Sequence, residues 1–179
     1  MSRLKRWIIV ASVGFLCLIP LFALVAIAGV VSYWGFGVDH VDSSLFGPNF
    51  LVLAEAPPVP ERQVYGLVAA LVPLLLWLCA QVRLFVMFAL CASGRALGTA
   101  TVRHLRAFSL YAALAVLSGF ALSGVMRWAA GEFDDAPLWT HLGFSTTHAA
   151  VLFMAAIMFV ASHIIEEGYD YKRETEEYV

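Results

Sequence analysis

Apolar and polar residues follow one another along this chain in long blocks, with no short alternation. Each of four blocks is almost entirely apolar and reaches the length of about 20 helical residues that crosses a bilayer. They cover residues 7–34, 64–91, 107–128 and 138–165. A segment in lipid must satisfy its own backbone hydrogen bonds, so each block is predicted to be a membrane-spanning helix. The predicted fold class is all-α, an integral membrane four-helix bundle in one domain, 1–179, with a tail at 166–179.

Composition supports lipid as the solvent. Hydrophobic residues make up 61% of the chain and charged ones 13%, against roughly 45–50% and about 25% in soluble domains. The net charge of −2 argues against direct nucleic-acid binding. Cys17, Cys79 and Cys91 lie inside or at the edge of apolar blocks and have no zinc-site spacing. We therefore predict no disulfide, no metal site and no cofactor.

Basic residues indicate the orientation. Of the eleven Lys and Arg residues, all but Arg62 and Arg127 precede the first block, surround the second connection or fall in the tail. The positive-inside rule then places both termini in the cytoplasm, in a multi-pass protein of the inner (plasma) membrane of the cell. The basic start also permits a cleavable signal peptide, but the block that follows is longer than a signal core.

Polar residues inside the blocks are few. His141, Ser145, His148 and His163 fall on one helical arc of 138–165, and Thr147 lies beside them. We predict an intramembrane polar patch of Ser145, Thr147 and His148, serving either an interhelical hydrogen bond or a proton or transport path. Haem ligation is disfavoured because the other histidines lie in loops and not on a facing helix.

A stripe of small residues runs along the third block at four-residue spacing: Ala115, Gly119 and Ser123. Such a stripe lets another helix approach closely. It is expected to pack within the bundle, with a homodimer as the alternative.

Two features mark the predicted cytoplasmic end. After Arg83 the stretch "LFVMFALC" continues the apolar run past the interface, and another part of the chain or a partner must cover it. The tail from Glu166 on has a net charge of −4, whereas the second connection carries Arg95, Arg103 and Arg106 and no acid. We expect tail and connection to pair with each other or to hold a soluble protein together.

The stretches "CASGRALGTATVRHLRAFS" and "IIEEGYDYKRETEEYV" resemble bacterial domain-of-unknown-function family 2975. Its members are small four-span membrane proteins, often encoded beside a helix-turn-helix regulator. Matching positions are Gly94, Leu105, Arg106, Glu167, Gly168, Glu174, Glu176 or Glu177, and Val179, whereas Leu97 and Gly98 replace the usual Phe and Ser. The family has no established activity, so the resemblance implies a fold, a membrane location and a class of partner.

These observations favour a non-enzymatic membrane anchor or sensor. Its partner-binding surface is predicted from Gly94, Arg95, Arg103, Arg106, Glu167, Glu174, Glu176 and Glu177. The partner, a small cytoplasmic helix-turn-helix regulator, is what the resemblance implies. A small transporter or channel subunit that uses the polar patch is the alternative. An enzyme is disfavoured because the sequence has no paired intramembrane carboxylates, no Ser/His/Asp arrangement and no phosphate-binding glycine loop.

Overall fold

The computed structural model describes residues 3–37, 58–93, 98–132, 142 and 144–177. They form four α-helices: α1 (Arg3–Phe36), α2 (Gln63–Ala92), α3 (Thr99–Ala129) and α4 (Thr146–Glu177). Each contains a stretch long and apolar enough to cross a membrane: Trp7–Phe36, Gln63–Ala92, Thr99–Ala129 and Thr146–Gly168. The predicted all-α fold of four packed, potentially membrane-spanning helices is therefore confirmed.

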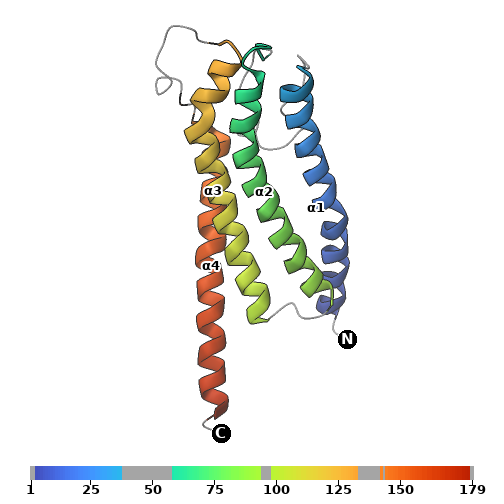
Figure 1. The fold of residues 1–179 in the computed structure, drawn as a ribbon. Helices are drawn as coiled ribbons and strands as arrows, with labels where there is room; N and C mark the ends of the chain where they lie inside the picture. Colours follow the sequence, from blue (N-terminus) through green and yellow to red (C-terminus); the bar gives the residue numbers. More distant parts are fainter. Residues whose placement is uncertain (1–2, 38–57, 94–97, 133–141, 143, 178–179) are drawn as a thin grey trace.

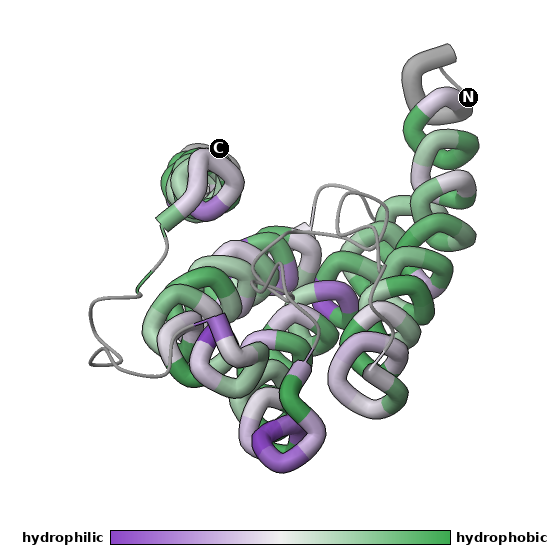
Figure 2. Tube along the Cα trace, turned by 90° about the horizontal axis from the view of Figure 1, so that it is seen from above, coloured by the Kyte–Doolittle hydropathy of each residue, from purple (hydrophilic) through white to green (hydrophobic). Residues whose placement is uncertain are grey.

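The helices run up and down in sequence order. Within the described residues α1 packs on α2, α2 on α3 and α3 on α4, and α1 does not contact α4. Seen from above, α1 and α4 lie at opposite ends of the group, which makes this an open bundle (Figure 2). Both chain ends lie at the same end of the bundle, and α4 extends past the other helices there (Figure 1). We call this the terminal end, and the opposite one the loop end.

The tightest packing joins α1 to α2 near the loop end. The indole of Trp34 is 1% exposed and lies directly against the backbone of Gly66, where an added Cβ would be 1.9 Å from Trp34 Cζ3. Ala69 and Ala70 on the next turn of α2 belong to the same buried cluster. Small residues on α2 thus let a large aromatic side chain of α1 approach the helix axis, the packing that holds helices together in lipid.

The small-residue stripe of α3 is used inside the chain. Ala115, Gly119 and Ser123 are all buried, and the Ser123 hydroxyl donates a hydrogen bond to the Phe120 carbonyl oxygen at 2.7 Å. This internal bond satisfies the hydroxyl without water. The stripe packs within the bundle, as expected, and its burial leaves these residues inaccessible to a second copy in this structure.

Two helix boundaries differ from those predicted by hydropathy. Helix α3 begins at Thr99 instead of Ala107, so Arg103 and Arg106 lie on its first turns and not in a loop. Helix α4 begins at Thr146, whereas the predicted span begins at 138. Hydropathy marks the part of the chain that suits lipid, and not the residue at which helical backbone hydrogen bonding begins.

The apolar stretch after Arg83 is partly covered by the chain itself. Phe88 stacks on Phe15 of α1 with ring centroids 4.7 Å apart and planes inclined by 13°. Phe85 remains 39% exposed. The sequence predicts that either another part of the chain or a partner covers this stretch. The structure shows the chain itself covering part of it.

Candidate functional site

The predicted polar patch is the N-terminal cap of α4. The backbone N–H of His148 donates to Ser145 Oγ at 3.4 Å, and the backbone N–H of Ser145 donates to Nδ1 of His148 at 3.1 Å. Ser145 Oγ also lies 2.5 Å from that Nδ1. This reciprocal pairing is a capping box in which His takes the position usually held by Glu or Gln. Ser145 and His148 thereby satisfy backbone donors that α4 would otherwise leave open.

The cap is closed off by aromatic rings. His148 is fully buried and its ring stacks on Phe144 at 5.6 Å, while Phe144 packs edge-on against Phe120 of α3 at 5.7 Å. Thr147 is half-buried on the same turn. The histidine therefore lies at the loop end of α4 and not midway along the span. A proton or transport path would need these polar side chains near the middle of the membrane, and they do not lie there.

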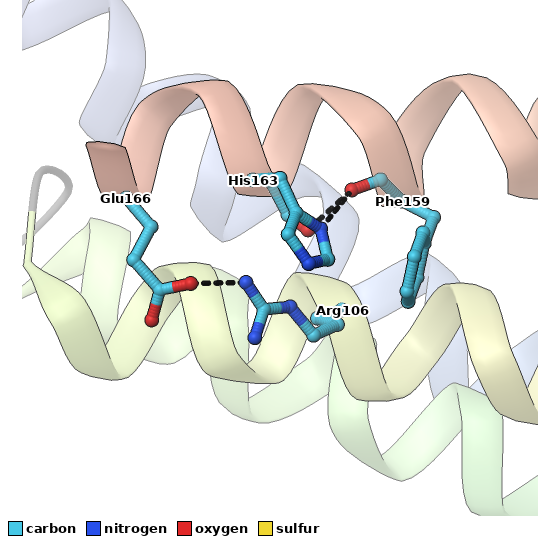
Figure 3. A network of polar contacts seen from close by, with 5 residues as sticks. Arg106, Phe159, His163 and Glu166 are labelled. Atoms are coloured by element: carbon cyan, nitrogen blue, oxygen red, sulfur yellow. Dashed lines mark hydrogen bonds and ion pairs between the residues drawn. The ribbon is translucent and has the colours of Figure 1, made fainter. Parts of the chain in front are cut away.

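The terminal end holds a polar junction between α3 and α4. The Arg106 guanidinium forms an ion pair with the Glu166 carboxylate (Figure 3). The two side chains are 33% and 47% exposed. His163, one turn before Glu166, contacts the Phe159 carbonyl oxygen through Nδ1 at 3.1 Å and packs against the Phe159 ring. Because a carbonyl only accepts, Nδ1 carries the proton in this contact.

This junction joins two regions that the sequence predicted to meet. Arg106 belongs to the basic set near the second connection, and Glu166 is the first residue of the acidic tail. Their ion pair is one of the two expected outcomes, tail pairing with connection. An exposed pair of this kind contributes about 0.2–1 kcal/mol, so it adds little to the packing of α4 on α3.

The other predicted partner-binding residues are spread along the terminal end. Arg103 is exposed on the second turn of α3 and Glu167 is exposed on α4. Gly94 and Arg95 lie outside the described residues. Glu174, Glu176 and Glu177 belong to the last turns of α4, and their side chains also lie outside the described part. The structure thus brings Arg106 to the base of the α4 tail and leaves the rest of the surface a prediction.

Charged residues mark both ends of the apolar part of α3. Arg106 and Arg127 are separated by about 21 helical positions, or about 31 Å at 1.5 Å per residue. Arg127 pairs with Glu132 at 3.6 Å, and the neighbouring Trp128 ring lies 4.7 Å from the Arg62 guanidinium carbon. Since a hydrocarbon core is about 30 Å thick, the spacing of these charges matches the distance between the two headgroup levels.

A groove on the bundle is wholly apolar in character. It has a volume of about 260 Å³ and lies where α2, α3 and α4 approach one another, lined by Trp77, Phe108, Ala112, Val151, Met154 and Met158 among others. No charged side chain lines it. In the described part of the chain no three His, Cys, Asp or Glu residues are grouped as metal ligands. The groove suits hydrocarbon and provides no group for acid–base chemistry.

No protein-family model, no curated protein and no solved structure matches this chain. The fold and the site together define a multi-pass membrane protein with four candidate spans. The resemblance to domain-of-unknown-function family 2975 stays a prediction.

Proposed function

We propose that this protein is a non-enzymatic membrane anchor or sensor of the bacterial inner membrane. Its terminal end faces the cytoplasm, and the projecting part of α4 binds a small DNA-binding regulator there. The orientation follows from the basic residues, which gather around the terminal end except for Arg62 and Arg127. The class of partner follows from the resemblance.

The observation that carries this proposal is the length and attachment of α4. From Glu166 the helix continues to Glu177, about 11 residues or about 16 Å past the ion pair with Arg106. We call residues 166–177 the α4 arm. One helix that begins in the bundle and is held to α3 at the base of its arm presents a preorganised surface. Binding to such a surface loses less conformational entropy than binding to a flexible tail.

The charge of the arm indicates the chemistry of its partner. Residues 166–177 contain six acidic and two basic residues, so the net charge is −4. DNA-binding regulators carry a basic face toward phosphate. An acidic arm is complementary to such a face, and a regulator bound to it would be kept from DNA. Complementary charge of this kind raises the association rate and selects the partner.

The test first searches beside the gene for a short helix-turn-helix reading frame, then coexpresses its product with this chain and captures the pair in mild detergent. Truncation after Glu167 keeps the ion pair and removes most of the arm, and we expect it to release the regulator. Replacing Glu174, Glu176 and Glu177 with Gln should weaken capture. The matched control, Lys172→Gln with Arg173→Gln, removes the opposite charge and should preserve or strengthen it.

Two results would contradict the proposal. A regulator that stays bound to the truncated chain does not bind the arm. The absence of any helix-turn-helix reading frame beside the gene would remove the reason for expecting this partner. The transporter alternative has less support, because Ser145 and His148, on which it depended, form the cap of α4.

A further inference from the structure

A second group of basic residues lies at the terminal end, apart from the junction of Arg106 with Glu166. The Arg83 guanidinium of α2 lies over the Tyr111 ring of α3, 5.9 Å from its centroid, so this side chain is directed across the α2–α3 interface. His104 of α3 lies within electrostatic range of both Arg83 and Arg103. Arg83 and Arg103 are exposed. Arg83 of α2 and Arg103 of α3 thus both lie near the His104 ring.

Nothing in the described part of the chain neutralises this group. The ion pairs among the described residues join Arg106 to Glu166 and Arg127 to Glu132, and neither Arg83 nor Arg103 has one. Nδ1 of His104 is buried and has no hydrogen-bond partner among those same residues. Guanidinium groups bind phosphate with charge-assisted hydrogen bonds, and neither of these two is paired with a carboxylate in the described part of the chain.

The depth of Arg83 identifies which anion is available. Arg62, at the loop end of α2, and Arg83 are separated by about 21 positions, or about 31 Å along a helix. This distance equals the thickness of the hydrocarbon core. With Arg62 at one headgroup level, Arg83 therefore lies at the headgroup level of the opposite leaflet. The phosphodiester of a phospholipid lies at that level, and basic pockets between membrane helices bind anionic headgroups.

We propose that Arg83, Arg103 and His104 form a binding site for the headgroup of an anionic phospholipid. The two guanidinium groups bind the phosphate, and the His104 ring supplies a further polar group from α3. The site does not depend on the α4 arm or on its partner, because its residues lie on α2 and α3. It also does not depend on which face of the membrane the terminal end occupies.

The experiment measures lipids retained by the whole chain. Protein purified in detergent is equilibrated with equal amounts of phosphatidylglycerol and phosphatidylcholine of matched acyl chains, and bound lipid is counted by native mass spectrometry. The unaltered chain should retain phosphatidylglycerol preferentially. Arg83→Gln and Arg103→Gln should each lower that preference about fivefold, the effect of one basic residue at an anionic surface.

The matched control is Arg62→Gln, which removes an arginine that also lies over an aromatic ring, Trp128, but at the loop end. It should leave the preference unchanged. Equal retention of the two lipids by the unaltered chain would overturn the proposal, and so would an equal loss in Arg62→Gln and Arg83→Gln. Displacement of phosphatidylglycerol by excess inorganic phosphate would show a site for soluble anions and would also overturn it.

Salt provides a measurement that needs no variant, should either Gln variant fail to fold. Raising the salt from about 0.05 M to about 0.5 M shortens the Debye length several-fold. The preference for phosphatidylglycerol should then fall if charge holds the headgroup. A preference that does not change with salt would contradict a site built from arginines.

Discussion

Replacing Gly66 with alanine tests the closest approach between α1 and α2. The Cβ of the new residue would lie 1.9 Å from Cζ3 and 2.3 Å from Cε3 of Trp34, well inside van der Waals contact. The Trp34 ring is almost completely buried and packs edge-on against Tyr33 with centroids 4.8 Å apart. Moving the ring away breaks those contacts, so the two helices must separate or Trp34 must leave its site.

The size of the effect follows from two opposing terms. Alanine in place of glycine favours the helix by about 1 kcal/mol. Overpacking costs typically 1–3 kcal/mol, and losing the packing of a large aromatic side chain costs about 3–5 kcal/mol. We expect Gly66→Ala to lower the free energy of unfolding by up to about 2 kcal/mol net if the helices shift, and by about 2–4 kcal/mol net if Trp34 leaves its site. The assay is titration of the purified chain in mild detergent with SDS, followed by tryptophan fluorescence.

The control is Gly14→Ala in α1, where an added Cβ meets nothing within 4 Å. This change should leave stability unchanged or raise it by up to about 1 kcal/mol. In a Trp34→Ala background the cost of Gly66→Ala should disappear, because the clashing ring is gone. Equal costs of Gly66→Ala with and without Trp34 would refute the proposed contact.

Three further predictions concern the junction and the cap. In a double-mutant cycle of Arg106→Gln and Glu166→Gln, unfolding in detergent should show a coupling energy of about 0.2–1 kcal/mol; additive single effects would mean that the ion pair contributes nothing. Ser145→Ala should lower the free energy of unfolding by about 0.5–2 kcal/mol through loss of the α4 cap, and a neutral result in the same assay would argue against a cap. His148→Gln should be more stable than His148→Leu, because Gln is a normal residue at this capping-box position; equal stabilities of these two variants would show that the ring acts only by packing.

Hydropathy predicts the helices of this fold well because lipid permits few alternatives. A long apolar segment cannot leave its backbone unpaired in hydrocarbon, so four such blocks mean four helices. Their ends are predicted less well. Arg103 and Arg106 look like loop residues because they are charged, yet they lie on α3, since a helix continues into the headgroup layer wherever its backbone can still bond.

The sequence contains the signal for the cap of α4, but the same residues also suggest another role. Ser145 and His148 have the spacing of a capping box, and the imidazole in place of a carboxylate or amide made them resemble an intramembrane patch. The open arrangement of the helices was not predictable from the apolar pattern. In lipid every face of a span is apolar, so the pattern does not show which helices are neighbours. The contact of Trp34 with Gly66 requires α1 and α2 to be neighbours, so the apolar pattern does not predict it.

The central claim is a chain that crosses the membrane four times and has both ends on one side. Paired reporters that are active only inside or only outside the cell can be fused after Ser93, after Gly131 and after Val179. The account predicts that fusions at Ser93 and Val179 report the cytoplasm and the fusion at Gly131 reports the opposite side. Fusions at Gly131 and Val179 that report the same side would contradict it.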